Sequence, residues 1–236
     1  MSHYEFFDEL RFRLSGDRAL LVDCGEGIDP AVNEKVLRLA SQLRRKPPRG
    51  VQAIVPAYRC FAVIYDPLLT GPDTLKREIS LLENAQDRLT PTRGKIVRIP
   101  VCYGGEFGPD MDCVSSVTNL APGEIIAIHS AREYPVYMLG FTPGFCYLGG
   151  MDERLRSPRR ETPRVSSAAG SVGIAELQTG MYPIPSPGGW QIIGKTPLRL
   201  FAPERQNPFL YKAGDRIRFE PISRDEFERL SQKERP

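Results

Sequence analysis

Hydrophobic and polar positions over roughly the first 90 residues follow two alternating periods, which predict strands and helices in turn. The segments FRL and ALLVDCG flank a Gly16-Asp17 turn and predict a pair of strands. A helix is expected next, because Asp29 suits an N-cap, Pro30 suits the first helical position, and Pro47 and Pro48 end the pattern. Its apolar face repeats at helical spacing through Val32, Val36, Leu39 and Leu43.

The following segments repeat this arrangement. VQAIVPAY and CFAVIYD are rich in β-branched and aromatic residues and are separated by little more than Arg59, so they predict a second strand pair. A second helix is expected from Pro72-Asp73, with Leu75, Ile79 and Leu82 on one face. The resulting order, ββαββα, predicts an α+β sandwich in which the helices cover one face of an antiparallel sheet.

The pattern changes between Thr90 and Gly94, which we interpret as a linker. KIVRIPVCYGG then predicts a strand, and short helices are expected at about 109–119 and 124–130. The later strand-like segments YPVYMLGF, QIIG, LRLF and IRFE are punctuated by glycine and proline, and their spacing favours an antiparallel barrel over βαβ units. The tail RDEFERLSQKERP predicts a short charged helix or a frayed end. We therefore expect two domains, residues 1–92 and residues 93–236.

Composition and charge narrow the classes of function. The chain has 236 residues and a net charge of +3, which is too small for long-range attraction to nucleic acid or to acidic membranes. No segment approaches the about 18 consecutive apolar residues of a membrane span, and MSHYEFFDEL lacks the basic start of a secretory peptide. We expect a cytoplasmic protein that binds neither nucleic acid nor membrane.

The five cysteines are spread along the chain and form no C-x-x-C pair, which argues against a disulfide framework and against a zinc site. We expect buried or half-buried thiols and no bound metal. Cys102 and Cys146 lie beside glycine-rich segments and are candidates for reactivity. Neither is assigned a catalytic role, because a nucleophilic cysteine needs a nearby base and the chain has only two histidines.

His129, in IIAIHSA, is the leading acid–base candidate, because His3 lies near the start of the chain. The alternative is a histidine at a helix end, hydrogen-bonded to a carbonyl. Glu106 and Asp110, in GGEFGPD, come just before a predicted helix. Asp110 is expected to cap that helix, whereas Glu106 is a second catalytic candidate that either transfers a proton or orients His129.

Glycines, prolines, aromatics and hydroxyls alternate from residue 170 to residue 197, which indicates backbone that can approach a ligand closely. In SPGGW, a sharp turn is expected to expose backbone amides beside the chain's only tryptophan, as an oxyanion or carboxylate site requires. The alternative is that the same residues form a structural hairpin turn. Lysine and threonine follow shortly and are candidates for holding phosphate or carboxylate. We expect no Walker-type phosphate loop. The binding candidates from this stretch are Gly188, Gly189, Trp190, Lys195 and Thr196.

A loop rich in arginine precedes this stretch. It contains Arg154, Arg156, Arg159, Arg160 and Arg164, with Glu161 as its only acidic residue. Such a cluster is suited to an anion or to an acidic partner surface, although a solvated loop explains most of its members. Arg164 is the member assigned to binding.

Several motifs occur together and in a characteristic order: CYGGEFGPD, HS, LGFTPGFCYLGG, PR, AGSVGIA, QTGMYP and SPGGWQIIGKTP. On these motifs the chain resembles the family of the 5-oxoprolinase B subunit, also called KipI-like or allophanate hydrolase subunit 1. The resemblance implies a ferredoxin-like amino-terminal domain followed by a cyclophilin-like antiparallel β-barrel. It also implies a companion subunit of the KipA or allophanate hydrolase subunit 2 type and a third subunit, which together open the lactam of 5-oxo-L-proline to L-glutamate with ATP and magnesium.

The resemblance also implies roles for the candidate residues. Arg164 or Lys195 would bind the substrate carboxylate, the amides of Gly188 and Gly189 would stabilise the oxyanion, and His129 would deliver a proton. Gln178 and Tyr182, in QTGMYP, would hydrogen-bond the lactam, although Tyr182 suits barrel packing equally well. We expect the loop that carries Trp190 to face His129 across one concave site.

Some positions depart from the family pattern. Ser167-Ala168 stand where Val-Pro is expected, Glu176-Leu177 stand where a glycine is common, and Lys195 replaces a frequent arginine. These departures leave the substrate open among 5-oxoproline, urea and allophanate. An alternative from another class is a regulatory protein that inhibits a sensor histidine kinase, as KipI does. Prolyl isomerisation rests on barrel analogy alone.

Overall fold

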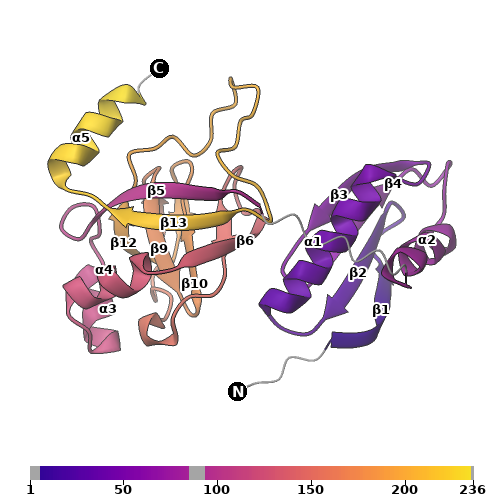
Figure 1. Cartoon of the computed structure of the whole chain (residues 1–236), viewed down its shortest axis with the longest axis horizontal. Helices are drawn as coiled ribbons and strands as arrows, with labels where there is room; N and C mark the ends of the chain where they lie inside the picture. The colour runs from indigo at the N-terminus through magenta and orange to yellow at the C-terminus, as the bar shows by residue number, and fades with distance from the viewer. Residues whose placement is uncertain (1–5, 85–93, 235–236) are drawn as a thin grey trace. The chain divides into compact units, whose positions relative to one another are not determined.

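The structure, a computed structural model, describes residues 6–84 and 94–234 (Figure 1). The chain divides into two compact units, Met1–Arg93 and Gly94–Pro236. The expected boundary between residues 92 and 93, most of the expected linker and His3 lie outside the described residues. None of the described helices is both long and apolar enough to span a bilayer.

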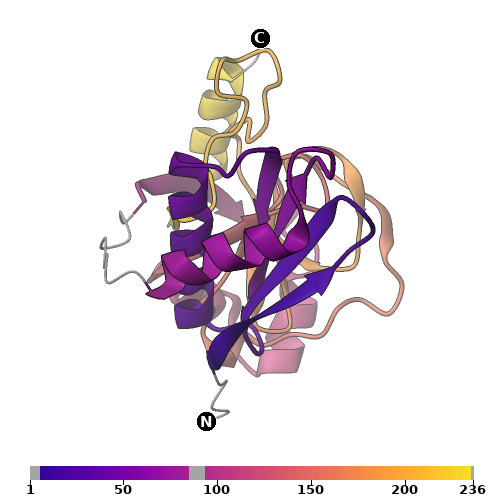
Figure 2. The same cartoon turned by 90° about the vertical axis from the view of Figure 1, so that its right-hand side faces the viewer.

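The first unit is a four-stranded antiparallel sheet covered by two helices. Its elements are β1 (Phe6–Leu14), β2 (Ala19–Gly25), α1 (Pro30–Arg45), β3 (Val51–Pro56), β4 (Cys60–Tyr65) and α2 (Pro72–Asn84). The strand order is β1-β2-β4-β3, so β4 lies between the strands that α1 connects, which is the split β-α-β arrangement of ferredoxin-like folds. The helices contact each other and pack on the sheet (Figure 2). The expected ββαββα order is confirmed.

Local signals place the first helix as predicted. Asp29 is its N-cap, and the Asp29 carboxylate accepts hydrogen bonds from the amides of Ala31 and Val32 at 2.8 and 3.1 Å. Its apolar face is buried against the sheet in a core that belongs to this unit alone. The core includes Leu20, Val22, Val32, Val36, Leu39, Leu43, Phe61, Val63, Leu75 and Ile79.

The second unit is a closed barrel with added helices. It begins with β5 (Ile96–Tyr103), α3 (Met111–Thr118), α4 (Pro122–Ser130), β6 (Glu133–Leu139), β7 (Cys146–Leu148) and the 3₁₀ turn Glu153–Leu155. It continues with β8 (Arg164–Ser167), β9 (Ser171–Ala175), β10 (Gln178–Met181), β11 (Ser186–Gly188), β12 (Gln191–Lys195), β13 (Arg216–Pro221) and α5 (Arg224–Lys233). The barrel order is β10-β7-β6-β13-β5-β12-β9, while β8 and β11 form a separate two-stranded ribbon. The fold class, an α+β sandwich followed by a β-barrel, is therefore confirmed.

Two expectations about the barrel were wrong in detail. The barrel is not wholly antiparallel, because β13 pairs with β5 in parallel. A parallel pair needs a long crossover, and nearly the whole unit lies between these two strands in sequence. The segment LRLF forms no strand, and only an isolated bridge joins Phe201 to Phe209. Its apolar residues pack without a ladder, since Leu200 is buried in the barrel core and Leu198 is partly buried against it.

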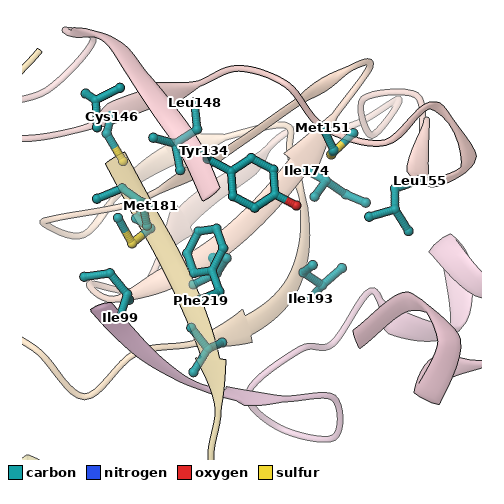
Figure 3. Packing of buried hydrophobic residues seen from close by; sticks show 14 of the residues in the cluster. Ile99, Tyr134, Cys146, Leu148, Met151, Leu155, Ile174, Met181, Ile193 and Phe219 are labelled. Atoms are coloured by element: carbon teal, nitrogen blue, oxygen red, sulfur yellow. The ribbon is translucent and has the colours of Figure 1, made fainter. Parts of the chain in front are cut away.

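The barrel interior is filled by side chains from its strands and from the segments between them, such as Met151 and Leu155 (Figure 3). Tyr134, Phe219, Ile174 and Met181 are among its fully buried members. Alternation along the strands sends neighbouring residues to the other side. On β7, for example, Cys146 and Leu148 belong to the interior core, whereas Tyr147 packs with a second cluster. The barrel thus has a filled interior and a separate apolar cluster on its outer side.

Candidate functional site

His129 lies inside the barrel at the end of α4 and has no exposed surface. Its ring stacks on Phe219 with centroids 4.5 Å apart. The Nδ1 atom lies 2.8 Å from the Tyr103 hydroxyl, and the Nε2 atom lies 2.9 Å from the Thr179 hydroxyl. Burial lowers the pKa of His129 from 6.5 to about 3. The imidazole is therefore neutral across the physiological range.

The hydrogen bonds around His129 fix its tautomer. The Thr179 hydroxyl donates its one proton to the carbonyl of Gly173 at 3.0 Å, so it accepts from Nε2–H of the imidazole. Nδ1 is then the acceptor for the Tyr103 hydroxyl. Both ring nitrogens are satisfied by hydroxyl groups and not by the carbonyl considered as an alternative. These surroundings favour a structural role, and proton transfer by His129 stays a prediction.

The expectation that Trp190 faces His129 is wrong. His129 bonds Thr179, whereas the Trp190 ring packs over Gly180, where an added Cβ would lie 3.1 Å from it. Thr179 and Gly180 are consecutive on β10, so the Thr179 side chain and a Cβ built on Gly180 point to opposite faces of the strand. The imidazole is inside the barrel and the indole is outside it.

The cluster around Trp190 forms what we term the outer face. Its buried members are Phe145, Ala175, Tyr182, Trp190 and Ile192, and Tyr147 is half-buried beside them. The Phe145 ring meets the rings of Tyr182 and Trp190 edge-on at 5.1 and 5.4 Å. Gln178 lies two residues before Gly180 on β10 and pairs with Ala175 on β9. Strand alternation therefore places its side chain on the outer face. The structure therefore gathers the predicted residues Gln178, Tyr182 and Trp190.

The β8–β11 ribbon borders the outer face; two more candidates, Arg164 and Gly188, lie on it, and a third, Gly189, directly follows it. Gly188 pairs with Arg164 across the ribbon. A Cβ on Gly188 would lie 2.2 Å from the Tyr182 hydroxyl oxygen, so this glycine is required for packing. The carbonyl of Gly189 accepts a hydrogen bond from the amide of Arg160 at 2.7 Å. The tight backbone seen in SPGGW thus joins the ribbon to the arginine loop.

Asp110 connects this region, and its role differs from the expected one. It occupies the N-cap position of α3, but its side chain makes no capping bond. Instead its carboxylate accepts from Arg160 at 2.8 Å, from Arg164 at 2.5 Å and from the amide of Ile192 at 2.6 Å. The capping prediction for Asp110 was wrong because two guanidinium groups and a strand amide take both carboxylate oxygens. Only 5% of the Asp110 side chain is exposed.

The other candidates lie outside this cluster. Glu106 is exposed and forms an ion pair with Arg224 on α5, and it has no contact with His129. Lys195 is half-buried at the end of β12. Thr196 is buried, and its hydroxyl accepts from the amide of Leu198 at 3.3 Å. None of these three joins the outer face.

Sequence reading missed a motif in this stretch. Residues 189–196, GWQIIGKT, satisfy the letters of the phosphate-binding pattern G-x-x-x-x-G-K-[ST]. That pattern cradles phosphate only as a loop between a strand and a helix. Here residues 191–195 form β12, which pairs with both β5 and β9. The backbone amides of this segment are therefore used in strand pairing and do not form a phosphate-binding loop.

Sequence reading also missed Phe141, in GFTPGF. This residue has a left-handed φ of 67°, which is rare for an aromatic residue, and 60% of it is exposed. Its ring meets Phe145 edge-on at 5.6 Å, so it borders the outer face. Strained exposed residues cluster at ligand and partner sites, and the glycine-rich turn around Phe141 was the available signal.

The cysteines and possible metal ligands add no chemistry to the site. Cys24, Cys102 and Cys146 are buried, Cys60 is half-buried, and Cys113 is exposed, unlike the burial expected for all five. Burial raises the pKa of Cys146 to about 12 and also raises that of Cys102. Among the residues that the structure describes, no three of His, Cys, Asp and Glu are grouped so as to hold a metal ion.

These features define a two-unit α+β protein in which a split β-α-β sandwich precedes a closed barrel with an aromatic and arginine-rich outer face. Residues 10–211 match the family model of the carboxyltransferase domain, subdomain C and D. A curated relative, the 5-oxoprolinase B subunit of Bacillus subtilis (strain 168), is 46% identical over 90% of this chain and 92% of its own length. The corresponding subunit of Escherichia coli O157:H7 is 39% identical over 89% and 95%. The chain belongs to the 5-oxoprolinase B-subunit family within the carboxyltransferase domain family.

Solved structures agree with this fold. TTHA0988 is 39% identical with a TM-score of 0.78 over 87% of this chain, and the chain spans only 40% of that longer protein. PH0987 from Pyrococcus horikoshii is 44% identical over 92% of this chain and all of its own, with a TM-score of 0.56. The urea amidolyase of K. lactis, at 20% identity and a TM-score of 0.77, shares the fold.

Proposed function

We propose that this chain works as a subunit of an ATP-dependent 5-oxoprolinase that hydrolyses 5-oxo-L-proline to L-glutamate. The observation that carries the proposal is the 46% identity to a 5-oxoprolinase B subunit over nearly the full length of both chains. The motifs that support it meet in space. GGEFGPD, the arginine loop and SPGGWQII are joined through the carboxylate of Asp110 and the backbone of Gly189.

The outer face suits a small cyclic amide. Lactams resist hydrolysis because resonance stabilises them. Transfer of a phosphoryl group from ATP to the lactam oxygen makes the ring carbon more electrophilic, so that water adds to it and the C–N bond breaks to give the amine and an acyl phosphate. A second water then hydrolyses the acyl phosphate to the carboxylate and phosphate. In this proposal Gln178 hydrogen-bonds the lactam, and the half-buried Tyr147 and the exposed Phe141, at the rim of the aromatic cluster, offer apolar surface to its ring. His129 lies on the opposite side of β10, so proton transfer at the outer face requires another group.

The residues of this chain do not fit a magnesium–nucleotide site. The only phosphate-loop letters identified, residues 189–196, include strand β12, and the described residues contain no cluster of metal ligands. We therefore place ATP and magnesium on companion subunits. The companions in this proposal are a subunit of the KipA or allophanate hydrolase subunit 2 type and a third 5-oxoprolinase subunit.

Reconstitution tests this function. Co-expression with the companion subunits should give a complex that forms glutamate from 5-oxo-L-proline only with ATP, and omission of this chain should abolish turnover. In the complex, Gln178→Ala should lower kcat/KM by about tenfold or more, since a lost hydrogen bond costs about 1–3 kcal/mol. Gln206→Ala, on an exposed loop, is the matched control and should stay within about twofold. An assembled complex without turnover would reject the proposal.

A further inference from the structure

Arg159 differs from the other arginines of its loop. Among the described residues no carboxylate pairs with it, whereas each neighbour has an acidic partner. The neighbouring pairs are Arg154 with Asp152, Arg156 with Glu176, and both Arg160 and Arg164 with Asp110. Glu161 is exposed and takes part in no ion pair of the described residues. The Arg159 guanidinium is therefore available to an anion from outside the chain.

Arg159 is exposed and lies beside Trp190, because Pro158 and Arg160 are hydrogen-bonded to Gln191 and Gly189, the two chain neighbours of Trp190. Burial raises the pKa of Tyr147 and of Tyr182, and the positive charge of Arg159 opposes the rise at both hydroxyls. This effect agrees with a guanidinium on the same side of the barrel as the outer face. Tyr147 in turn lies 6.0 Å from the Trp190 ring, centroid to centroid. A cation thus stands beside the aromatic cluster.

The backbone that carries Arg159 is held on both sides. The carbonyl of Pro158 accepts from the Gln191 side chain at 3.1 Å, and the amide of Arg160 donates to Gly189 at 2.7 Å. One residue earlier, the carbonyl of Ser157 accepts from the amide of Glu176 at 2.6 Å. An exposed side chain on a fixed backbone can bind an anion with less ordering cost than one on a mobile loop.

Arg164, the arginine first assigned to binding, has less capacity left. Its guanidinium donates to Asp110 at 2.5 Å and to the Trp190 carbonyl at 3.4 Å, and only 21% of its side chain is exposed. Arg164 therefore serves to hold the ribbon and the Trp190 turn in place. Arg159, with which no carboxylate of the described residues forms an ion pair, is the neighbouring arginine that can still bind a carboxylate from outside the chain.

We propose that Arg159, whose loop is hydrogen-bonded to both neighbours of Trp190, is the specificity-determining residue that binds the carboxylate of a small cyclic amide at the outer face. This inference rests on the proposed function and assigns to one residue the recognition of the acid group that distinguishes 5-oxo-L-proline from a neutral lactam. The planar guanidinium binds a carboxylate through two parallel hydrogen bonds, and a neutral lactam offers no such partner.

Fluorescence of the isolated chain tests the inference without companion subunits, because Trp190 is its only tryptophan. Titration with 5-oxo-L-proline should give a saturable change, whereas 2-pyrrolidinone, the same lactam without the carboxylate, should give none at equal concentration. R159Q should raise the Kd for the acid at least about tenfold, and R159K should raise it less, because lysine keeps the charge and loses the fork. Arg154→Gln, an exposed arginine of the same loop paired with Asp152, should leave the Kd unchanged.

Three results would overturn the inference: no saturable response with the acid, an equal response with the neutral lactam, or an unchanged Kd in R159Q. If R159Q does not fold, the Kd of R159K for 5-oxo-L-proline is compared with that of the parent chain instead, and an unchanged Kd then overturns the inference. Turnover separates this inference from the proposed function. A complex that hydrolyses 5-oxo-L-proline with the same KM in R159Q refutes the inference alone, and a chain that binds the acid in a complex without turnover refutes the function alone.

Discussion

At the scale of single residues, burial decides what each titratable group can do. His129 is enclosed by the rings of Phe219 and Tyr134 and by two hydroxyl partners, so its charged form is disfavoured. Asp110 is equally enclosed, yet two guanidinium groups and an amide satisfy its carboxylate. His129 is therefore a neutral part of the barrel core, and Asp110 holds the arginine loop and β12 together beside the candidate site.

The low pKa of His129 makes stability depend on pH. An unfolded histidine binds a proton near pH 6.5, whereas the folded one does so only at about 3. Between these values the unfolded state binds more protons, so the free energy of unfolding falls as the pH is lowered from 6.5 toward 3. The contribution of one proton approaches about 1.4 kcal/mol per pH unit.

Urea denaturation at several pH values measures this effect. A His129→Asn variant should lose stability at pH 7 and show a shallower slope between pH 6.5 and 4 than the parent chain. A His3→Gln background leaves His129 as the only imidazole, so nitrogen NMR should report one neutral ring protonated at Nε2. A ring that titrates near pH 6.5 in the folded protein would contradict the structural role.

At the scale of elements, the candidate site is assembled from segments far apart in the sequence. Asp110 begins α3, Ile192 lies on β12, and the arginine loop leads into β8. The amide of Asp110 also donates to the Ile192 carbonyl at 3.0 Å, so backbone and side chain fasten the same two elements. A close backbone approach supports this joint, because a Cβ on Gly108 would lie 2.1 Å from the Ile193 carbonyl oxygen.

Removal of the Asp110 charge should loosen this joint. D110N leaves two partly buried guanidinium groups without their counter-charge and should lower the free energy of unfolding by about 3 kcal/mol. Thermal unfolding followed by circular dichroism measures the change. Asp152→Asn is the matched control, since Asp152 also bonds two arginines, Arg132 and Arg154, but these are more exposed; it should cost about 1 kcal/mol or less. Equal losses in both variants would show that the Asp110 cluster is an ordinary surface network.

At the scale of the whole molecule, each unit has a core of its own. The sandwich core contains residues 10–79 only, and the barrel core contains residues 97–219 only. The outer face is also made entirely within the second unit. The barrel unit therefore contains every contact that the candidate site requires.

A fragment of residues 94–236 should accordingly fold alone. Its thermal unfolding should be cooperative, and its NMR spectrum should retain the neutral His129 ring. The fluorescence response of Trp190 to 5-oxo-L-proline should match that of the full chain, because the outer face is complete in the fragment. A fragment that melts without cooperativity would show that the barrel depends on the first unit.

Local signals predicted the elements well and the site only in part. Asp29 with Pro30 and the β-branched strand pairs were confirmed, and the short helices expected at about 109–119 and 124–130 were found within about two residues, because caps and periodicity act within a few residues. LRLF resembled a strand in composition, but no neighbouring strand pairs with it. Residues 189–196 match the phosphate-loop pattern, but they include strand β12, whose backbone groups are hydrogen-bonded to β5 and β9.

The sequence alone determined the α+β class, the order of the elements in the first unit and the family motifs, since each depends on neighbouring residues. Tertiary structure decided which motif residues meet. Barrel closure made the face of β10 that carries Thr179 interior and the face of Gly180 exterior, and so separated His129 from Trp190, while the Asp110 side chain at the start of α3 bonds two arginines distant in sequence. It also left Arg159 without an acidic partner among the described residues. Such pairings depend on strand order and register across many residues, which periodicity along one segment does not specify.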